Sequence, residues 1–341
     1  MRAVLIYNPA AGQHDQRAAV EEAAEHLRSR RWTVTVRQTQ KPGDAQTYAR
    51  EAVAGGLDAV IVAGGDGTIN EAVNGLAYSE VALGVLPSGT ANVWAQEIGL
   101  PVPRLLNPDP HPLLTCAAQL ADGVVRAMDL GRAGGRYFML YGSIGYDAHI
   151  VQQMDSSPSA IALKQQLGGA AYYLMGFRAA WSFTGRRAVI VIDGKRLRRR
   201  IWSVMAANTQ LYGGVIRIAA DARADDGWLD IVVVRGHGLL ATARHFASFI
   251  FRGLWADPQV EVYRARKAEV YTRKPLPVQV DGDIAGQTPV KFEVAPRAIR
   301  VLVPRGAPPR IFTDPPVTTL TVEDAALRQA QGEVRGEIRG S

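Results

Sequence analysis

A strand-length apolar run that ends in a glycine-rich turn is the feature that most constrains this chain. Residues 57–62 have the apolar character of a strand, Gly64-Gly65-Asp66-Gly67-Thr68 follow, and a helical pattern begins at once. Glycines after a strand let the backbone turn tightly and approach a ligand without a Cβ in the way. The N–H groups that open the next helix then face an anion. The junction predicts a phosphate-binding loop, although it has neither the Lys-Ser/Thr of a P-loop nor G-x-G-x-x-G.

The first hundred residues alternate strand and helix patterns. Strands are expected at residues 3–7, 33–36, 57–62 and 82–86, and helices at 16–30, 44–53, 69–76, 91–98 and 113–121. Strict alternation of this kind predicts an α/β domain, in which an open parallel sheet carries helices on both faces.

The pattern changes near residue 128. Short strand-like runs follow, separated by turns such as Asp193-Gly194, Asp226-Gly227 and Asp281-Gly282, which is typical of an all-β antiparallel sandwich or barrel. Two helical stretches, 159–183 and 239–252, are inserted. We therefore expect an α/β domain at 1–128, a sandwich domain at 129–304 and an active-site cleft between them. A tail at 305–341 would return to the first domain and end in disorder.

Composition limits the classes of protein to consider. The 341 residues are 47% hydrophobic, enough for two cores, and the net charge of +7 with a pI near 9.6 favours an anionic partner. Nucleic acid fits the charge, but no reader motif is present, so we expect none bound. The single cysteine, Cys116, excludes an intrachain disulfide and indicates a reducing compartment. Because no long uncharged apolar stretch occurs, we expect a cytoplasmic protein without a transmembrane helix.

Four turns should meet at one edge of the predicted sheet. They are Asn8–Gly12, Thr39–Ala45, Gly64–Thr68 and Pro87–Asn92, and each follows a strand. Ligands of open parallel sheets bind at the carboxyl ends of the strands, so all four turns would lie on the ligand-binding edge.

The chain resembles the diacylglycerol kinase catalytic family, which includes bacterial soluble lipid kinases and the sphingosine and ceramide kinases. The matching segments are Asn8-Pro-x-x-Gly12, Gly64-Gly-Asp-Gly-Thr-Ile-Asn-Glu71, Leu86-Pro-Ser-Gly-Thr-Ala-Asn92, Asp225-Asp-Gly-Trp-Leu-Asp230 and Val280-Asp-Gly-Asp283. They occur in the family's order over residues 1 to about 304. The set is specific, whereas Gly-Gly-Asp-Gly-Thr alone is shared with NAD kinases.

The resemblance implies a kinase that uses ATP and Mg²⁺. The first domain would bind the nucleotide and the second the lipid. The positions that would bind the cofactor are Asn8, Pro9, Ala10, Ala11, Gly12, Thr39, Gly64, Gly65, Asp66, Gly67, Thr68, Ile69, Asn70, Ser88, Gly89, Thr90 and Asn92. A structural magnesium position matches the side chain of Asp226 and the carbonyls of Arg223 and Trp228, donors that suit a hard cation. Taken alone, the 225–227 segment would be a plain hairpin turn.

Three aspartates are the catalytic candidates. Asp281-Gly282-Asp283 matches the family's Asp-Gly-Glu, which carries the proposed general base; we expect Asp281 to be the base and Asp283 to support it. Asp283 is one methylene shorter than the usual Glu, which blurs this choice. Many bacterial members place an Asp where this chain has Val93. Asp66 is therefore expected to be the main local support of the catalytic metal.

The substrate side carries aromatic and basic residues together. The stretches 159–183 and 239–252 suit an anionic bilayer surface, or else pack on the sandwich. Arg196–Arg200, with four arginines, is either a solvated strand edge or a membrane-facing patch.

The sequence thus predicts a peripheral, ATP-dependent lipid kinase that transfers the γ-phosphate to a lipid hydroxyl, of diacylglycerol or a related lipid. An NAD kinase-like enzyme and a catalytically impaired lipid- or nucleotide-binding protein are the alternatives. The oligomeric state stays open, a dimer included.

Overall fold

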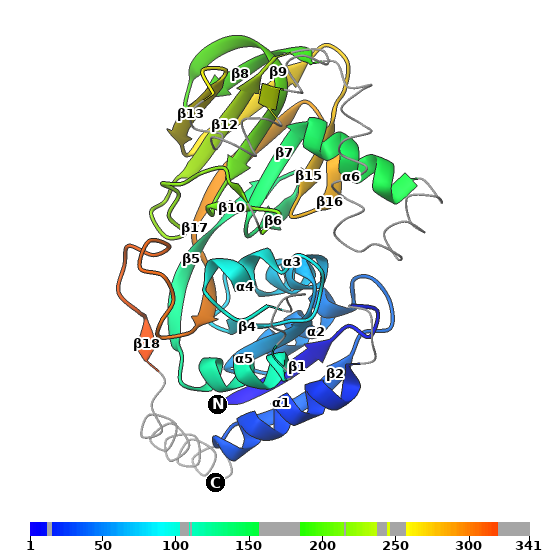
Figure 1. Ribbon diagram of the computed structural model, residues 1–341, viewed down its shortest axis with the longest axis vertical. Helices are drawn as coiled ribbons and strands as arrows, with labels where there is room; N and C mark the ends of the chain where they lie inside the picture. Colours follow the sequence, from blue (N-terminus) through cyan, green and yellow to red (C-terminus); the bar gives the residue numbers. More distant parts are fainter. Residues whose placement is uncertain are drawn as a thin grey trace.

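The computed structural model describes residues 1–11, 16–102, 109, 111–156, 185–214, 216–236, 244–245 and 257–319. Two domains are stacked along the long axis of the molecule (Figure 1). The predicted class is confirmed, because a mixed α/β domain with parallel strands precedes a β-sandwich-like domain. Gly12, the stretch 159–183 and most of the stretch 239–252 lie outside the described residues. No helix within the described ranges is long and apolar enough to cross a membrane.

The first domain is built as strand–helix units. In chain order they are β1 (Arg2–Tyr7), α1 (Arg17–Ser29), β2 (Thr33–Gln38), α2 (Asp44–Ala54), β3 (Ala59–Gly64), α3 (Asp66–Leu76), β4 (Ala82–Pro87), α4 (Val93–Glu97) and α5 (Pro112–Ala121). The sheet order is β4-β3-β1-β2, and all three pairings are parallel. All carboxyl ends therefore meet at one edge.

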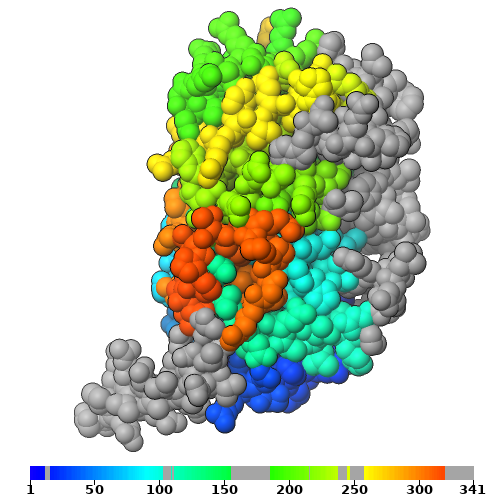
Figure 2. Space-filling model, turned by 60° about the vertical axis from the view of Figure 1, so that its left-hand side comes forward, coloured from blue at the N-terminus to red at the C-terminus, as the bar shows by residue number. Residues whose placement is uncertain are grey.

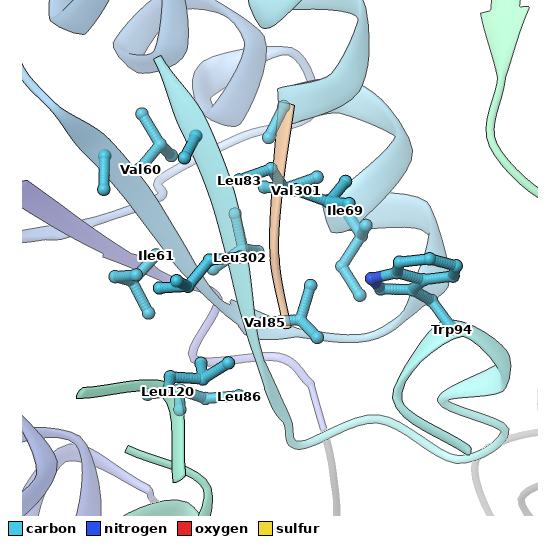
Figure 3. Close-up of a cluster of buried hydrophobic side chains, with 14 of the residues drawn as sticks. Val60, Ile61, Ile69, Leu83, Val85, Leu86, Trp94, Leu120, Val301 and Leu302 are labelled. Carbon is cyan, nitrogen blue, oxygen red and sulfur yellow. The ribbon is translucent and has the colours of Figure 1, made fainter. Parts of the chain in front are cut away.

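The core of this domain includes the strands that lead into the turns and the helix that follows the fourth turn. β3 and β4 are buried at every position, as expected for parallel strands that helices cover on both faces. Figure 3 shows Trp94 of α4 beside Ile69 of α3, within the same cluster as Val85. Because the Trp94 side chain is fully buried, it fixes the short helix that follows the fourth turn.

Helix α4 starts two residues later than the sequence pattern predicts. Asn92 has φ of 47°, in the left-handed region, so the helical conformation begins only at Val93. The sequence pattern also missed α6 (Tyr146–Ser156), whose weakly amphipathic residues follow β7 (Tyr141–Gly145) directly.

The second domain is antiparallel. Its elements are β6 (Arg136–Phe138), β7, α6, β8 (Arg186–Ile192), β9 (Lys195–Ala207), β10 (Leu211–Tyr212), β11 (Ile216–Arg217), β12 (Leu229–Arg235), β13 (Val260–Ala265), β14 (Lys267–Thr272), β15 (Pro277–Val280) and β16 (Asp283–Gln287). β9 pairs with β7, β8 and β12, and separate hydrophobic clusters form on its two faces.

Two long strands join the domains. β5 (Val124–Ala133) and β17 (Val290–Val303) pair antiparallel, and β17 also pairs with β14 of the second domain and β4 of the first. Residue 128, the predicted boundary, lies within β5. After β17 the chain returns to the first domain, where β18 (Thr318–Thr319) pairs with β5 and Phe312 packs edge-on against Trp94. The sheet is thus continuous between the domains.

Candidate active site

The structure brings the four predicted turns to one edge of the sheet, where hydrogen bonds link the turns to one another or to the ends of neighbouring strands. The Asn8 amide donates to the Thr68 hydroxyl at 3.0 Å, which joins the first turn to the third. The Thr39 N–H donates to the Tyr7 carbonyl at 2.9 Å, and the Ser88 N–H donates to the Gly64 carbonyl at 3.3 Å. The four turns therefore form one surface at the carboxyl edge of the sheet.

Glycines allow two of these turns to touch through their backbones. A Cβ on Gly89 would lie 2.4 Å from the Cα of Gly65, closer than atoms can approach. Gly67 is exposed, at the start of α3. The first-turn amides of a helix lack intrahelical partners, and the helix dipole adds partial positive charge there. This turn has the features of an anion site.

Asp66 lies between this turn and α4. Its Oδ1 accepts a hydrogen bond from the Val93 N–H at 2.9 Å, while the Val93 side chain is buried in the core. The surrounding protein desolvates the carboxylate and raises the pKa of Asp66 to about 6, against the opposing effect of the Val93 amide. Val93 therefore contributes a backbone donor at the position where many bacterial members of the resembled family have an Asp.

The Asp281 side chain is hydrogen-bonded to the surrounding backbone. It opens the hairpin between β15 and β16, where Asp281 and Gly282 both have positive φ, 46° and 92°. Its carboxylate accepts hydrogen bonds from four donors: the N–H groups of Met139 (2.7 Å), Leu140 (3.0 Å) and Tyr141 (3.0 Å), and the Asn70 amide (2.9 Å). Burial raises the pKa of Asp281 to about 6, while these donors favour the ionised form.

Asp283, unlike Asp281, is exposed at the surface. Its side chain is 43% exposed, and Oδ1 lies 3.9 Å from the point where a Cβ on Gly67 would sit. Oδ2 forms an ion pair with Arg136 Nη2 at 2.9 Å, and the same nitrogen donates to Asn70 Oδ1 at 3.0 Å. Asp283 therefore faces the glycine-rich turn, and Arg136 links it to α3.

Sequence reasoning missed Arg136. It lies in a three-residue strand with no motif of its own, 147 positions from Asp283. The pairing of β6 with β5, and of β15 with β16 and β7, places Arg136 near Asp283.

Some of the residues predicted to bind the nucleotide form hydrogen bonds within the protein, and others are buried or exposed. Asn70 and Asn92 are each 1% exposed. Asn70 binds the hairpin, and Asn92 holds the Gly89 backbone through Oδ1 and Nδ2. Ile69 is in the core, and Ser88 is buried, with no hydrogen-bond partner for its hydroxyl in the described part of the chain. Thr90, Pro9 and Ala10 are exposed on the surface of the four turns.

The predicted structural magnesium position does not fit a metal. Oδ1 of Asp226 accepts from the Trp228 N–H at 3.0 Å, and Oδ2 is paired with Arg264 at 2.5 Å. The neighbouring Asp225 accepts the amides of Thr313 and Asp314. Both oxygens of Asp226 are therefore engaged, and a guanidinium supplies the positive charge. The other two expected ligands, the carbonyl oxygens of Arg223 and Trp228, carry no formal charge.

Comparison with known proteins identifies the family of this chain. The model of the diacylglycerol kinase catalytic domain matches residues 2–133, and that of the YegS C-terminal NAD kinase beta sandwich-like domain matches residues 142–303. The diacylglycerol kinase of Bacillus subtilis is 31% identical over 307 residues, which cover 89% of this chain and 97% of the relative. The chain belongs to the diacylglycerol kinase family.

Other members of the diacylglycerol kinase family agree in length and fold. A probable lipid kinase YegS-like of Chromohalobacter salexigens is 31% identical over 308 residues, 89% of this chain and 93% of the relative. The crystal structure of a diacylglycerol kinase from Bacillus anthracis has a TM-score of 0.68 at 23% identity, covering 90% of this chain and 98% of that one, and supports the fold alone. The family assignment supports a lipid kinase.

Proposed function

We propose that this protein is an ATP-dependent lipid kinase that transfers the γ-phosphoryl group of ATP to the hydroxyl of diacylglycerol or a closely related lipid. The observation that carries the proposal is the approach of the Asp283 carboxylate to Gly67. It places an exposed carboxylate opposite the helix terminus suited to phosphates. The relatives named diacylglycerol kinase support the choice of lipid.

The four turns would hold the triphosphate. The amides at the start of α3 would bind phosphate oxygens, as helix N-termini do. Asp66 fits a magnesium ion that arrives with the nucleotide, because Mg²⁺ typically takes one or two protein carboxylates together with phosphates and waters. When bound, that ion would neutralise phosphate charge. We do not propose metal binding at Asp226, whose oxygens are engaged.

We propose that the two hairpin aspartates have roles opposite to those expected from the sequence. A lipid hydroxyl must lose its proton as it attacks phosphorus, and a carboxylate within hydrogen-bond reach can accept it. Asp281 would have to give up one of its four donors to do so. Asp283 is exposed and, among the described residues, has a single ion-pair partner, Arg136. In this proposal Asp283 is the base and Asp281 fixes the hairpin.

The experiment is a labelled-ATP assay with three acceptors: diacylglycerol in mixed micelles, NAD and water alone. Wild type should label diacylglycerol; labelling of NAD would support the NAD kinase-like alternative instead. Asp283→Asn should lower kcat by about 10²- to 10⁴-fold with unchanged thermal stability.

Asp193→Asn is a matched control, because Asp193-Gly194 is a second Asp-Gly turn with positive φ, away from the proposed site. It should keep full activity. Asp281→Asn should lower stability as well as activity, because its amide N–H₂ would replace one carboxylate oxygen and face two of the four N–H donors. Full activity in Asp283→Asn would contradict its assignment as the base.

A further inference from the structure

One face of the second domain carries arginines that have no acidic partner among the residues that the structure describes. We call Arg187 of β8 and Arg196, Arg198 and Arg200 of β9 the arginine face; all four are exposed. Leu197 and Ile201, which alternate with them, are buried. Because successive side chains of a strand point to opposite faces, the three β9 arginines share the outer face of the sheet.

The pairing register concentrates this charge. Arg187 lies directly opposite Arg200, and Arg198 lies opposite Val189. Like charges at directly opposed positions destabilise a sheet. No ion pair is recorded between Arg187, Arg196 or Arg198 and any residue in the part of the chain that the structure describes. Folding alone does not account for this arrangement.

Arg199 provides the contrast within the same strand. It points to the other face and is neutralised by Glu261, with Nε 3.0 Å from the carboxylate. An acidic partner is therefore supplied on one face of β9, whereas Glu269 of β14, which lies on the outer face opposite Val191, pairs with Lys267 of its own strand.

The outer face also offers apolar surface between the charges. Val189 and Val191 are half-buried, and Tyr271 of β14, opposite Val189, is 45% exposed. Figure 2 shows side chains of the β8–β9 region (green) projecting from the end of the molecule remote from the first domain. Tyrosine is enriched where proteins meet the headgroup region of a bilayer.

We propose that the arginine face docks this protein on an anionic lipid bilayer. Its exposed cations, with valines and a tyrosine beside them on the same face of the sheet, match a surface of anionic headgroups. A lipid substrate at that surface rests on the function proposed above, whereas the docking itself depends only on charge and exposure.

The test is cosedimentation with vesicles of phosphatidylglycerol and phosphatidylcholine, against vesicles of phosphatidylcholine alone, at low and high salt. Wild type should bind the anionic vesicles, and salt should weaken this binding. Arg196→Gln/Arg198→Gln should weaken it by about 30-fold, from the gain typical of an arginine near an anionic surface. Arg31→Gln/Arg50→Gln removes equal charge from exposed positions of the first domain and should have little effect.

Two further measurements separate this proposal from the proposed function. Phosphorylation of a short-chain, dispersed diacylglycerol should be the same in wild type and Arg196→Gln/Arg198→Gln. If wild type binds anionic vesicles but phosphorylates no lipid, docking stands and the kinase proposal fails. Equal vesicle binding by the two double variants would overturn the docking proposal. So would wild-type binding to duplex DNA without binding to anionic vesicles.

Discussion

Arg136 is one residue whose removal should separate positioning from chemistry. Its guanidinium is bound to both Asp283 and Asn70, so it fixes the proposed base relative to α3. Arg136→Gln should lower kcat by about ten-fold or more and leave the KM for ATP nearly unchanged, because the base loses its orientation. Arg136→Lys should recover part of the activity. Steady-state kinetics on wild type and both variants check this.

A double-mutant cycle tests whether Arg136 acts through Asp283. In an Asp283→Asn background, Arg136→Gln should have almost no further effect on kcat, since coupled residues are not additive. Arg132→Gln is the matched control: Arg132 lies in the adjacent strand, near the Tyr137 ring, and should not affect kcat. Fully additive effects of Arg136→Gln and Asp283→Asn would contradict the positioning role.

Asp66 should give the reaction an acidic limb. Because its pKa is raised to about 6, kcat/KM for magnesium-ATP should fall roughly ten-fold per pH unit below pH 6, as the carboxylate loses the charge that attracts the metal. The effect on stability has the opposite sign. A carboxyl with a raised folded-state pKa adds stability that is complete below about 3.8 and lost as pH rises through about 6.

Asp66→Asn separates these two consequences of the raised pKa. The variant should be inactive at every pH, and its melting temperature should fall less steeply than that of wild type between about pH 4 and 6. A pH series of melting curves, with wild type as reference, measures this slope. An unchanged slope would contradict the raised pKa.

At the scale of elements, the loop before β12 is expected to be independent of metal. Arg264 already pairs with Asp226, and this arginine and Arg266 both lie over the ring of Trp228, at 5.6 and 4.8 Å from its centroid. Without nucleotide, the melting temperature of wild type should be the same with Mg²⁺ and with EDTA. Arg264→Gln frees the carboxylate and should make the melting temperature rise with Mg²⁺. A magnesium-dependent rise in wild type that Asp226→Asn abolishes would contradict this.

The sequence predicts those features of the molecule that residues close together in the chain determine, and fails for those that depend on pairing between distant strands. The turns after β1 to β4 were predictable, because apolar runs of strand length and glycines at their ends determine them locally. The partners of Asp226, Asp281 and Asp283 were not, because Arg264, Met139 and Arg136 reach them only through pairing between distant strands. The sequence identified the carboxylates of the site, and the sheet topology determined which of them is engaged.

At the scale of the whole molecule, the shared strands make the two domains depend on each other. β5 and β17 each contribute to both cores, as the long antiparallel pair in Figure 1 shows. Val301 and Leu302, near the carboxyl end of β17, pack in the core of the first domain (Figure 3). Substitutions in β17 should therefore affect the packing of both domains.

The return of the chain after β17 should be part of this cooperative unit. Ile311 and Phe312 are buried in the core of the first domain, and Phe312 covers Trp94. The amides of Thr313 and Asp314 satisfy the Asp225 carboxylate, which would otherwise be left buried without donors.

The test compares a chain truncated after residue 304 with one truncated after residue 319. Only the first loses these contacts, and loss of a buried Phe alone typically costs about 3–5 kcal/mol. Its melting temperature, measured by calorimetry, should therefore be lower by about 10 °C. Phe312→Ala in the full chain should reproduce part of this loss, whereas equal melting temperatures for the two truncated chains would show that the returning segment does not stabilise the fold.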